Sequence, residues 1–266
     1  MKALLDNRFV PLTFSLGFVE SPFALFSEAF ASWQINLDTK FKTKTDIIRF
    51  AAPLAEALKS LEPLTTPLDR YVLIETRSNW TSIFSNGLRV NDVASPVGYL
   101  SGLLHCRGLT TSSVPDRSEL HANKNAIRIY GAVTFTLYGP EKTDWLNRIR
   151  RVSVTNDVSG WEFAAEGEVQ PYEQVENYAR RKVVERFTPG MLESYCRALG
   201  IDLLEETFYG GRCLMSHVTN RLGPSGLSMS IADARSCVNI HGWSYPELPY
   251  SAGRPLFSRT AGKGDF

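Results

Sequence analysis

Between residues 127 and 137 of this 266-residue chain, apolar side chains occupy every second position. Ile127, Val133, Phe135 and Leu137 fall on one side of an extended backbone, and tyrosine and threonine side chains fall on the other. A period of two residues fits a strand with one buried face, whereas the apolar face of a helix repeats every 3.6 residues. The segment therefore predicts a long strand and excludes a helix there.

Two shorter segments after this strand complete a predicted meander. Residues 151–155 and 161–165 are both rich in side chains that favour strands. The residues between them, from Asn156 to Gly160, have the composition of a tight turn. We therefore expect a three-stranded antiparallel meander over residues 126–168.

Other segments predict helices and further strands. Residues 12–18 alternate as a half-buried strand does, and residues 71–75 form a compact run of β-forming side chains. Apolar spacing of three and four residues predicts helices at residues 23–33, 47–61, 95–104 and 188–200, and Pro53 must start, kink or split the second of these. A further helix is expected at residues 173–186. Together these elements predict an α+β fold, with an antiparallel sheet of about five or six strands covered by helices.

The last of these helices has the clearest boundaries. Thr188 is a good capping residue, Pro189 suits the first helical position, and Gly200 suits the position just after the end. Beyond this helix the apolar pattern fades, and glycine, serine and proline become frequent. We therefore expect one α+β domain over residues 1–211 and a loop-rich, poorly packed C-terminal tail over residues 212–266.

Composition and charge favour a cytoplasmic protein. The net charge of +1 creates no general attraction to nucleic acid or to an anionic membrane. No apolar run reaches the roughly 18 residues of a membrane helix. Asp6, Pro11 and Glu20 interrupt the N-terminal apolar segment, which disfavours a signal peptide. Charge and apolar runs together predict no membrane partner. The four cysteines form no C-x-x-C pair, so we expect reduced, buried thiols.

No sequence motif in the chain has the residues that a known chemistry requires. The four histidines are scattered without the spacing of metal ligands. His105 and Cys106 are adjacent, so their side chains point in different directions and form a poor catalytic pair. Glu75 and Arg77 resemble part of a nuclease motif, but arginine stays protonated and cannot act as a base. We therefore predict no catalytic residue, no metal site and no cofactor.

The candidate binding residues lie in two predicted turns. Arg77, Asn79 and Trp80 follow the strand at residues 71–75, and binding residues are frequent on loops that a rigid scaffold positions. Trp80 is the preferred contact residue, because tryptophan is enriched at binding surfaces. Asp157 and Glu162 lie at the meander turn and, with Arg77 and Asn79, are the first residues to consider if the chain is an enzyme.

A group of basic residues offers a third possibility. It comprises Arg148, Arg150, Arg151, Arg180, Arg181, Lys182 and Arg186. Glutamates are interleaved with these residues at spacings that allow ion pairs along a helix. A solvated, ion-paired face is therefore favoured over a surface for nucleic acid or phosphate.

Several short strings between residues 70 and 210 resemble a group of bacterial proteins without an assigned function. The strings are residues 76–81, 138–140, 153–157, 161–168 and 186–209. The resemblance implies a genuine domain over about half of the chain. It implies no site residue, because none of these strings is a catalytic motif.

Three functions remain open from the sequence. The first is a soluble, non-enzymatic binding protein, for which an immunity protein that neutralises a cognate bacterial toxin is a natural setting. The near-neutral charge counts against a basic nuclease as that toxin, since its inhibitor would favour an acidic face. The second is an enzyme with a site assembled from distant residues, and the third is a nucleic-acid or phosphate binder that uses the arginines.

Overall fold

The computed structural model describes residues 4–88, 93–116, 130–143, 147–157, 159–220 and 226–238. Its centre is a nine-stranded sheet, in the order β2-β10-β4-β5-β1-β6-β7-β8-β9, with every neighbouring pair antiparallel. The strands are β1 (Ser15–Val19), β2 (Lys44–Ala51), β4 (Arg70–Thr76), β5 (Thr81–Ser85), β6 (Gly108–Val114), β7 (Ala132–Tyr138), β8 (Arg148–Asp157), β9 (Gly160–Gly167) and β10 (Tyr209–Thr219). The α+β class is confirmed, but the sheet is larger than the five or six strands expected.

The predicted meander is confirmed in the described residues as β7, β8 and β9. Phe135 pairs with Val152, and Val152 pairs with Ala165, so one face of all three strands is apolar at this level. Asp157 pairs with Gly160 at the hairpin, where the turn was predicted. Strand β7 begins at Ala132, and the predicted positions 127–129 lie outside the described residues.

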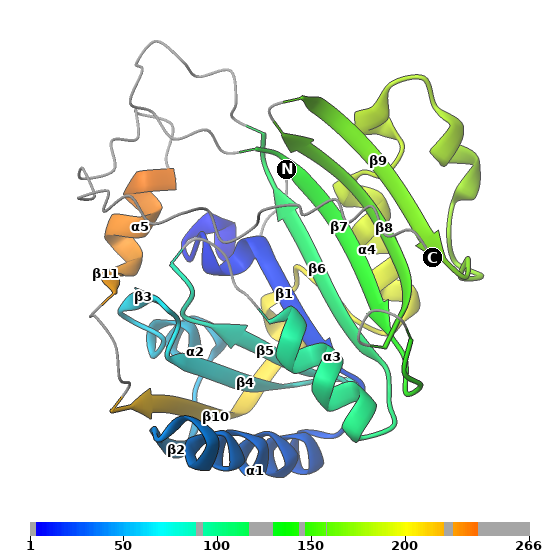
Figure 1. Ribbon diagram of the computed structural model, residues 1–266. Coiled ribbons are helices and arrows are strands. Elements are labelled where there is room, and N and C mark those ends of the chain that lie inside the picture. Colours follow the sequence, from blue (N-terminus) through cyan, green and yellow to red (C-terminus); the bar gives the residue numbers. More distant parts are fainter. Residues whose placement is uncertain are drawn as a thin grey trace, which may run out of the picture.

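Helices cover both faces of the sheet (Figure 1). The α-helices are α1 (Phe23–Phe41), α2 (Leu54–Lys59), α3 (Ala94–Leu103), α4 (Pro189–Ala198) and α5 (Ile231–Val238). Helices α1 and α3 pack on one face, where Phe26, Phe30 and Leu73 are fully buried. Helices α2 and α4 pack on the other face over a larger core that contains Phe84 and Phe135. The two cores are separated by the sheet itself.

Short elements complete the chain. A second sheet joins β3 (Leu64–Thr66) to β11 (Leu227–Met229) in antiparallel fashion. The 3-10 helices are η1 (Leu4–Asn7), η2 (Leu12–Phe14), η3 (Val175–Ala179), η4 (Val183–Glu185) and η5 (Glu206–Phe208). None of the helices in the described residues is long and apolar enough to cross a membrane.

Helix α4 confirms the predicted cap. The side-chain oxygen of Thr188 accepts a hydrogen bond from the backbone N–H of Met191 at 3.3 Å, and Pro189 is the first helical residue. Gly200 follows the helix with a φ of +79°, a left-handed conformation that glycine adopts without strain. The local chemistry of these residues is sufficient to define the helix.

Two helix predictions are wrong. Residues 47–61 contain a strand and a short helix, β2 and α2, and Pro53 separates them. In β2, Ile47 packs under α1 and Phe50 packs in the opposite core, which is the alternation of a strand between two layers. Residues 173–186 form only η3 and η4, neither of which has a buried residue. Without an apolar stripe, this segment gains no packing energy as a long helix.

The expectation that regular structure ends near residue 212 is also wrong. Strand β10 lies inside the main sheet between β2 and β4. Its neighbours Cys213 and Leu214 are both buried, one on each face, so the strand lacks the alternation by which half-buried strands are recognised. Further on, β11 pairs with β3, and Ile231 and Ala234 of α5 are buried. Residues 239–266 lie outside the described residues.

Candidate functional site

A hollow of about 430 Å³ lies between the C-terminal half of α1 and the ends of three strands of the sheet. We call it the α1 hollow. Its lining residues come from α1, β2, β4, β10 and the turn that joins β3 to β4: Trp33, Gln34, Leu37, Asp38, Phe41, Thr43, Thr45, Pro67, Leu68, Tyr71 and Val218. Its volume falls in the range of small-molecule sites, roughly 300–1,000 Å³.

Three aromatic rings form much of the wall of the α1 hollow. Trp33 and Phe41 come from α1, and Tyr71 comes from β4. The rings of Trp33 and Tyr71 both pack edge-on against buried Phe30, at centroid distances of 5.6 Å each. Because Phe30 is fully buried, these two walls are held in place before any ligand arrives.

Gln34 is the least ordinary residue of this lining. The residue is 3% exposed overall, and its amide makes no hydrogen bond to any described residue. The amide is nevertheless not among the side-chain groups that are buried without a partner, which in the described residues belong to Thr13, Ser21, Tyr172 and Ser216. It therefore keeps contact with the open space of the hollow. A polar group in this position is available to a ligand.

Asp38 places a negative charge at the rim of the α1 hollow. Its carboxylate accepts hydrogen bonds from the hydroxyls of Thr43 and Thr45, at 2.7 and 2.9 Å, and from the Thr45 N–H at 2.7 Å. Partial burial works to raise the pKa of Asp38, but these bonds outweigh it and the pKa lies below its ordinary value. The group is therefore a carboxylate at neutral pH.

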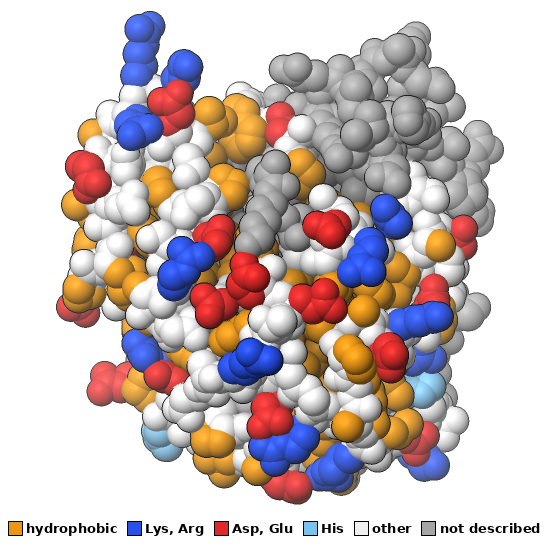
Figure 2. Space-filling view, turned by 180° about the vertical axis from the view of Figure 1, so that it is seen from behind, with side chains coloured by type: hydrophobic (Ala, Val, Ile, Leu, Met, Phe, Trp, Pro, Cys, Tyr) orange, Lys and Arg blue, Asp and Glu red, His pale blue; other side chains and the backbone are white. Residues whose placement is uncertain are grey.

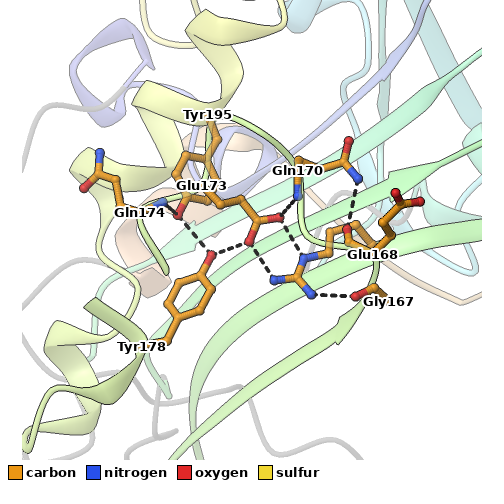
Figure 3. Close-up of polar contacts among 8 residues, drawn as sticks. Gly167, Glu168, Gln170, Glu173, Gln174, Tyr178 and Tyr195 are labelled. Atoms are coloured by element: carbon orange, nitrogen blue, oxygen red, sulfur yellow. Dashed lines mark hydrogen bonds and ion pairs between the residues drawn. The ribbon is translucent and has the colours of Figure 1, made fainter. Parts of the chain in front are cut away.

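A second polar cluster lies on the opposite face of the sheet, between β8 and the segment that follows β9 (Figure 3). Arg150 donates two hydrogen bonds to Glu173, from Nε at 2.8 Å and from Nη2 at 2.6 Å. The side chains of Arg150 and Glu173 are 3% and 0% exposed. Tyr178 donates to the same carboxylate at 2.6 Å, and the backbone N–H of Gln170 donates at 2.9 Å. We call this group the Arg150–Glu173 cluster.

The Arg150–Glu173 cluster has no spare capacity for a ligand. A carboxylate has about four positions for hydrogen-bond donors, and Glu173 fills four. Burial works to lower the pKa of Arg150, but the bonds to Glu173 more than offset this and raise it. Burial also raises the pKa of Tyr178 and of Tyr195, whose hydroxyls lie 3.0 Å apart. Arg150, Tyr178 and Tyr195 therefore keep fixed protonation states at neutral pH, as members of a structural cluster do.

Trp80 is not an exposed contact residue, so that prediction is wrong. The side chain is 3% exposed, and its indole N–H donates to the carbonyl of Leu199 at 2.8 Å. Tryptophan is as common in cores as at binding surfaces, and here it fills space between β5 and α4. Arg77 and Asn79, in the same turn, are exposed as expected.

Asp157 and Glu162 are exposed at the opposite end of the sheet. Thr81, next to Trp80, is level with Arg148 through a series of strand pairings across β1, β6 and β7. Asp157 lies nine residues beyond Arg148 on β8, so it is about 30 Å from the level of Trp80, measured along the strand. Arg77 and Asn79 therefore cannot share an active site with Asp157 and Glu162. Asp157 instead accepts hydrogen bonds from the N–H and hydroxyl of Ser159 within the turn.

The predicted basic group is divided by its ion pairs. Arg150 is buried with Glu173, while Arg148 pairs with Glu166 at 2.6 Å and Lys182 with Glu185 at 3.3 Å. Figure 2 shows positive and negative side chains intermixed across this face of the molecule. The expected solvated, ion-paired surface agrees with this arrangement.

The cysteines and histidines of the described residues form no reactive group. Burial raises the pKa of Cys106 to about 11, so the thiol is protonated at neutral pH and is a poor nucleophile. Cys196 and Cys213 are free and buried. In the part of the chain that the structure describes, no three His, Cys, Asp or Glu side chains gather as metal ligands do.

Comparison with known proteins adds no family to these observations. No protein-family model, no curated protein and no solved structure matches the chain. The resemblance over residues 70–210 therefore stays a prediction. No residue in the lining of the α1 hollow has a functional signal in the sequence, because Trp33 continues the apolar stripe of the helix expected over residues 23–33 and Gln34 is an ordinary helix residue.

Proposed function

We propose that this chain is a non-enzymatic binding protein and that the α1 hollow holds the group it recognises. The observation that carries this proposal is the amide of Gln34, which lines the hollow and makes no hydrogen bond to a described residue. A ligand that pairs with this amide would take the place of the water that otherwise meets it. The aromatic walls would supply most of the contact area.

Apart from the group held in the hollow, exposed apolar side chains give a protein partner a surface to contact. Five of them lie on α1 and α3, with 50–58% of each side chain exposed: Leu25, Ile35, Phe41, Tyr99 and Leu103. Trp33 of α1 packs against Tyr99 of α3 at 5.9 Å, which joins the two helices at this surface. An immunity protein, which neutralises a toxin by binding it, remains one setting for such a surface.

A neutral fluorescent probe tests the proposed site. N-phenyl-1-naphthylamine emits strongly only in apolar surroundings and is small enough for a hollow of about 430 Å³. We expect saturable binding that Phe41→Ser weakens about fivefold, since the substitution removes apolar contact area. Val175→Ser is the matched control, because Val175 is also exposed but lies on η3, away from the hollow.

Two results would contradict the proposal. One is an absence of saturable probe binding to the wild-type protein. The other is an equal loss of affinity in Phe41→Ser and Val175→Ser, which would place the probe on apolar surface in general. Melting curves of both variants verify that each remains folded during the titration.

A further inference from the structure

We infer that the α1 hollow selects a small organic cation, such as an alkylated ammonium compound. This inference rests on the proposed function and names the chemical class of its ligand. It follows from three features of the lining: its aromatic rings, the sign of its charge and the unpaired amide of Gln34.

The aromatic rings favour a cation. Trp33, Phe41 and Tyr71 belong to the three residue types whose ring faces attract positive charge, and tryptophan does so most strongly. Recognition of quaternary ammonium groups commonly uses several such rings around one centre. The Phe41 ring already attracts a cation here, since the exposed ammonium of Lys40 lies 5.5 Å from its centroid.

The charges around the hollow favour the same sign. Asp38 is the single ionisable carboxyl group among the lining residues, and none of those residues is lysine, arginine or histidine. The hydrogen bonds that Asp38 accepts leave it negatively charged at neutral pH. Lys40 stands outside the lining, but its exposed ammonium is 5.5 Å from the Phe41 centroid and opposes part of the attraction that Asp38 exerts. An anion would meet Asp38 with no compensating positive group in the lining.

Gln34 adds polar recognition to these charges. Its amide can accept a hydrogen bond through its oxygen and donate two through its nitrogen. A cation that carries a hydroxyl or amide beside its charged centre would pair with this amide, which lines the hollow and makes no hydrogen bond to a described residue. The volume of about 430 Å³ leaves room for such a substituent. The ligand class is thus an ammonium compound with an apolar surface and one polar substituent.

Three probes of one shape test this inference. Choline is the cation, 3,3-dimethylbutan-1-ol is its neutral isostere, and 3,3-dimethylbutanoate is an anion of similar size. Dissociation constants are measured by ligand-observed NMR titration of the full chain. We expect choline to bind about fivefold more tightly than the alcohol, as cation–π attraction allows, and the anion to bind most weakly.

Variants identify the groups that carry the selectivity. Asp38→Asn is expected to weaken choline about threefold and the alcohol less, since it removes the charge together with one of the two acceptor oxygens at the rim. Asp46→Asn is the matched control, because Asp46 is a neighbouring β2 carboxylate outside the lining. Trp33→Leu is expected to weaken choline about fivefold or more, and Trp33→Phe, which keeps an aromatic ring, to weaken it less.

The outcomes separate the inference from the proposed function. If the naphthylamine probe binds in the hollow but choline binds no better than its neutral isostere, the cation inference is wrong and the binding site stands. A failure of all three small probes in a protein that binds the naphthylamine has the same meaning. If the naphthylamine itself fails, the binding site is wrong and the inference falls with it.

Discussion

The Arg150–Glu173 cluster and the α1 hollow bury polar groups on opposite faces of the same sheet, in opposite ways. In the cluster, the four positions on the Glu173 carboxylate are filled by Arg150, Tyr178 and the Gln170 N–H. In the hollow, the amide of Gln34 makes no hydrogen bond to a described residue and keeps contact with the open space. The difference separates polar groups that the fold needs from polar groups that it keeps available. A complete set of partners indicates structure, and an incomplete set beside an open space indicates a ligand.

Removing one partner of the buried ion pair should have the largest effect on stability. Glu173→Gln leaves the guanidinium of Arg150 buried without a counter-charge. We expect the free energy of unfolding to fall by about 3–5 kcal/mol, measured by urea denaturation. Arg150→Met should lower the free energy of unfolding by a similar amount, since it leaves the carboxylate of Glu173 buried without a counter-charge.

The double variant controls for the loss of packing. Arg150→Met combined with Glu173→Met replaces both charges by apolar side chains, and such replacements are often neutral in other proteins. We expect it to recover most of the stability that either single variant loses. If each single variant costs less than about 1 kcal/mol, the Arg150–Glu173 cluster does not hold this part of the fold together.

Loss of the α4 cap should have a smaller effect in the same region. Helix α4 carries Tyr195, whose hydroxyl accepts a hydrogen bond from the Gln174 N–H at 2.8 Å beside the cluster. Thr188→Ala removes the cap on Met191 and should cost about 1 kcal/mol in thermal or denaturant melting. Thr188→Ser retains the cap and should melt close to the wild type. Equal losses in the two variants would contradict the assigned cap.

Asp38 provides a pH-dependent contrast at the rim of the hollow. Its pKa in the folded protein is lowered, so its contribution to stability is present above the unfolded-state pKa and is lost as the pH falls through the folded-state value. We expect the stability difference between wild type and Asp38→Asn to be constant from about pH 8 to pH 5 and to shrink from about pH 4 to pH 2. Urea denaturation at a series of pH values measures it. A difference that grows toward low pH would reverse the assigned direction.

The parts of the fold that the sequence predicts are those with one buried face or a local cap. Strands β7, β8 and β9 have one face that is less buried than the other, so apolar and polar residues alternate along their sequence. Thr188 caps the helix that begins directly after it, so that boundary is also visible in the local sequence. Strand β10 is covered on both sides and β2 lies next to it, so their apolar residues lack a simple period. The position of β10 depends on its pairing with β2 and β4, which lie more than 130 residues earlier in the chain, and a local sequence pattern cannot predict such a pairing.

The candidate site was harder to predict for the same reason. Its lining joins α1 to β2, β4 and β10, so it exists only after the sheet has formed. Gln34 has no distinguishing sequence signal, because its importance lies in a partner that it lacks. The one available hint was a glutamine at position 34 inside an aromatic helical stripe that includes Phe30 and Trp33, where an apolar side chain would be expected.

The free energy of unfolding of Gln34→Met tests the central claim most directly. Methionine has nearly the shape of glutamine but needs no hydrogen bond, so it removes the unpaired amide and little else. We predict that the variant is as stable as the wild type in urea denaturation, within about 0.5 kcal/mol, because an amide that meets water contributes little net stability. A loss of about 1 kcal/mol or more would show that Gln34 holds the fold together, and the proposed difference between the two polar regions would be contradicted.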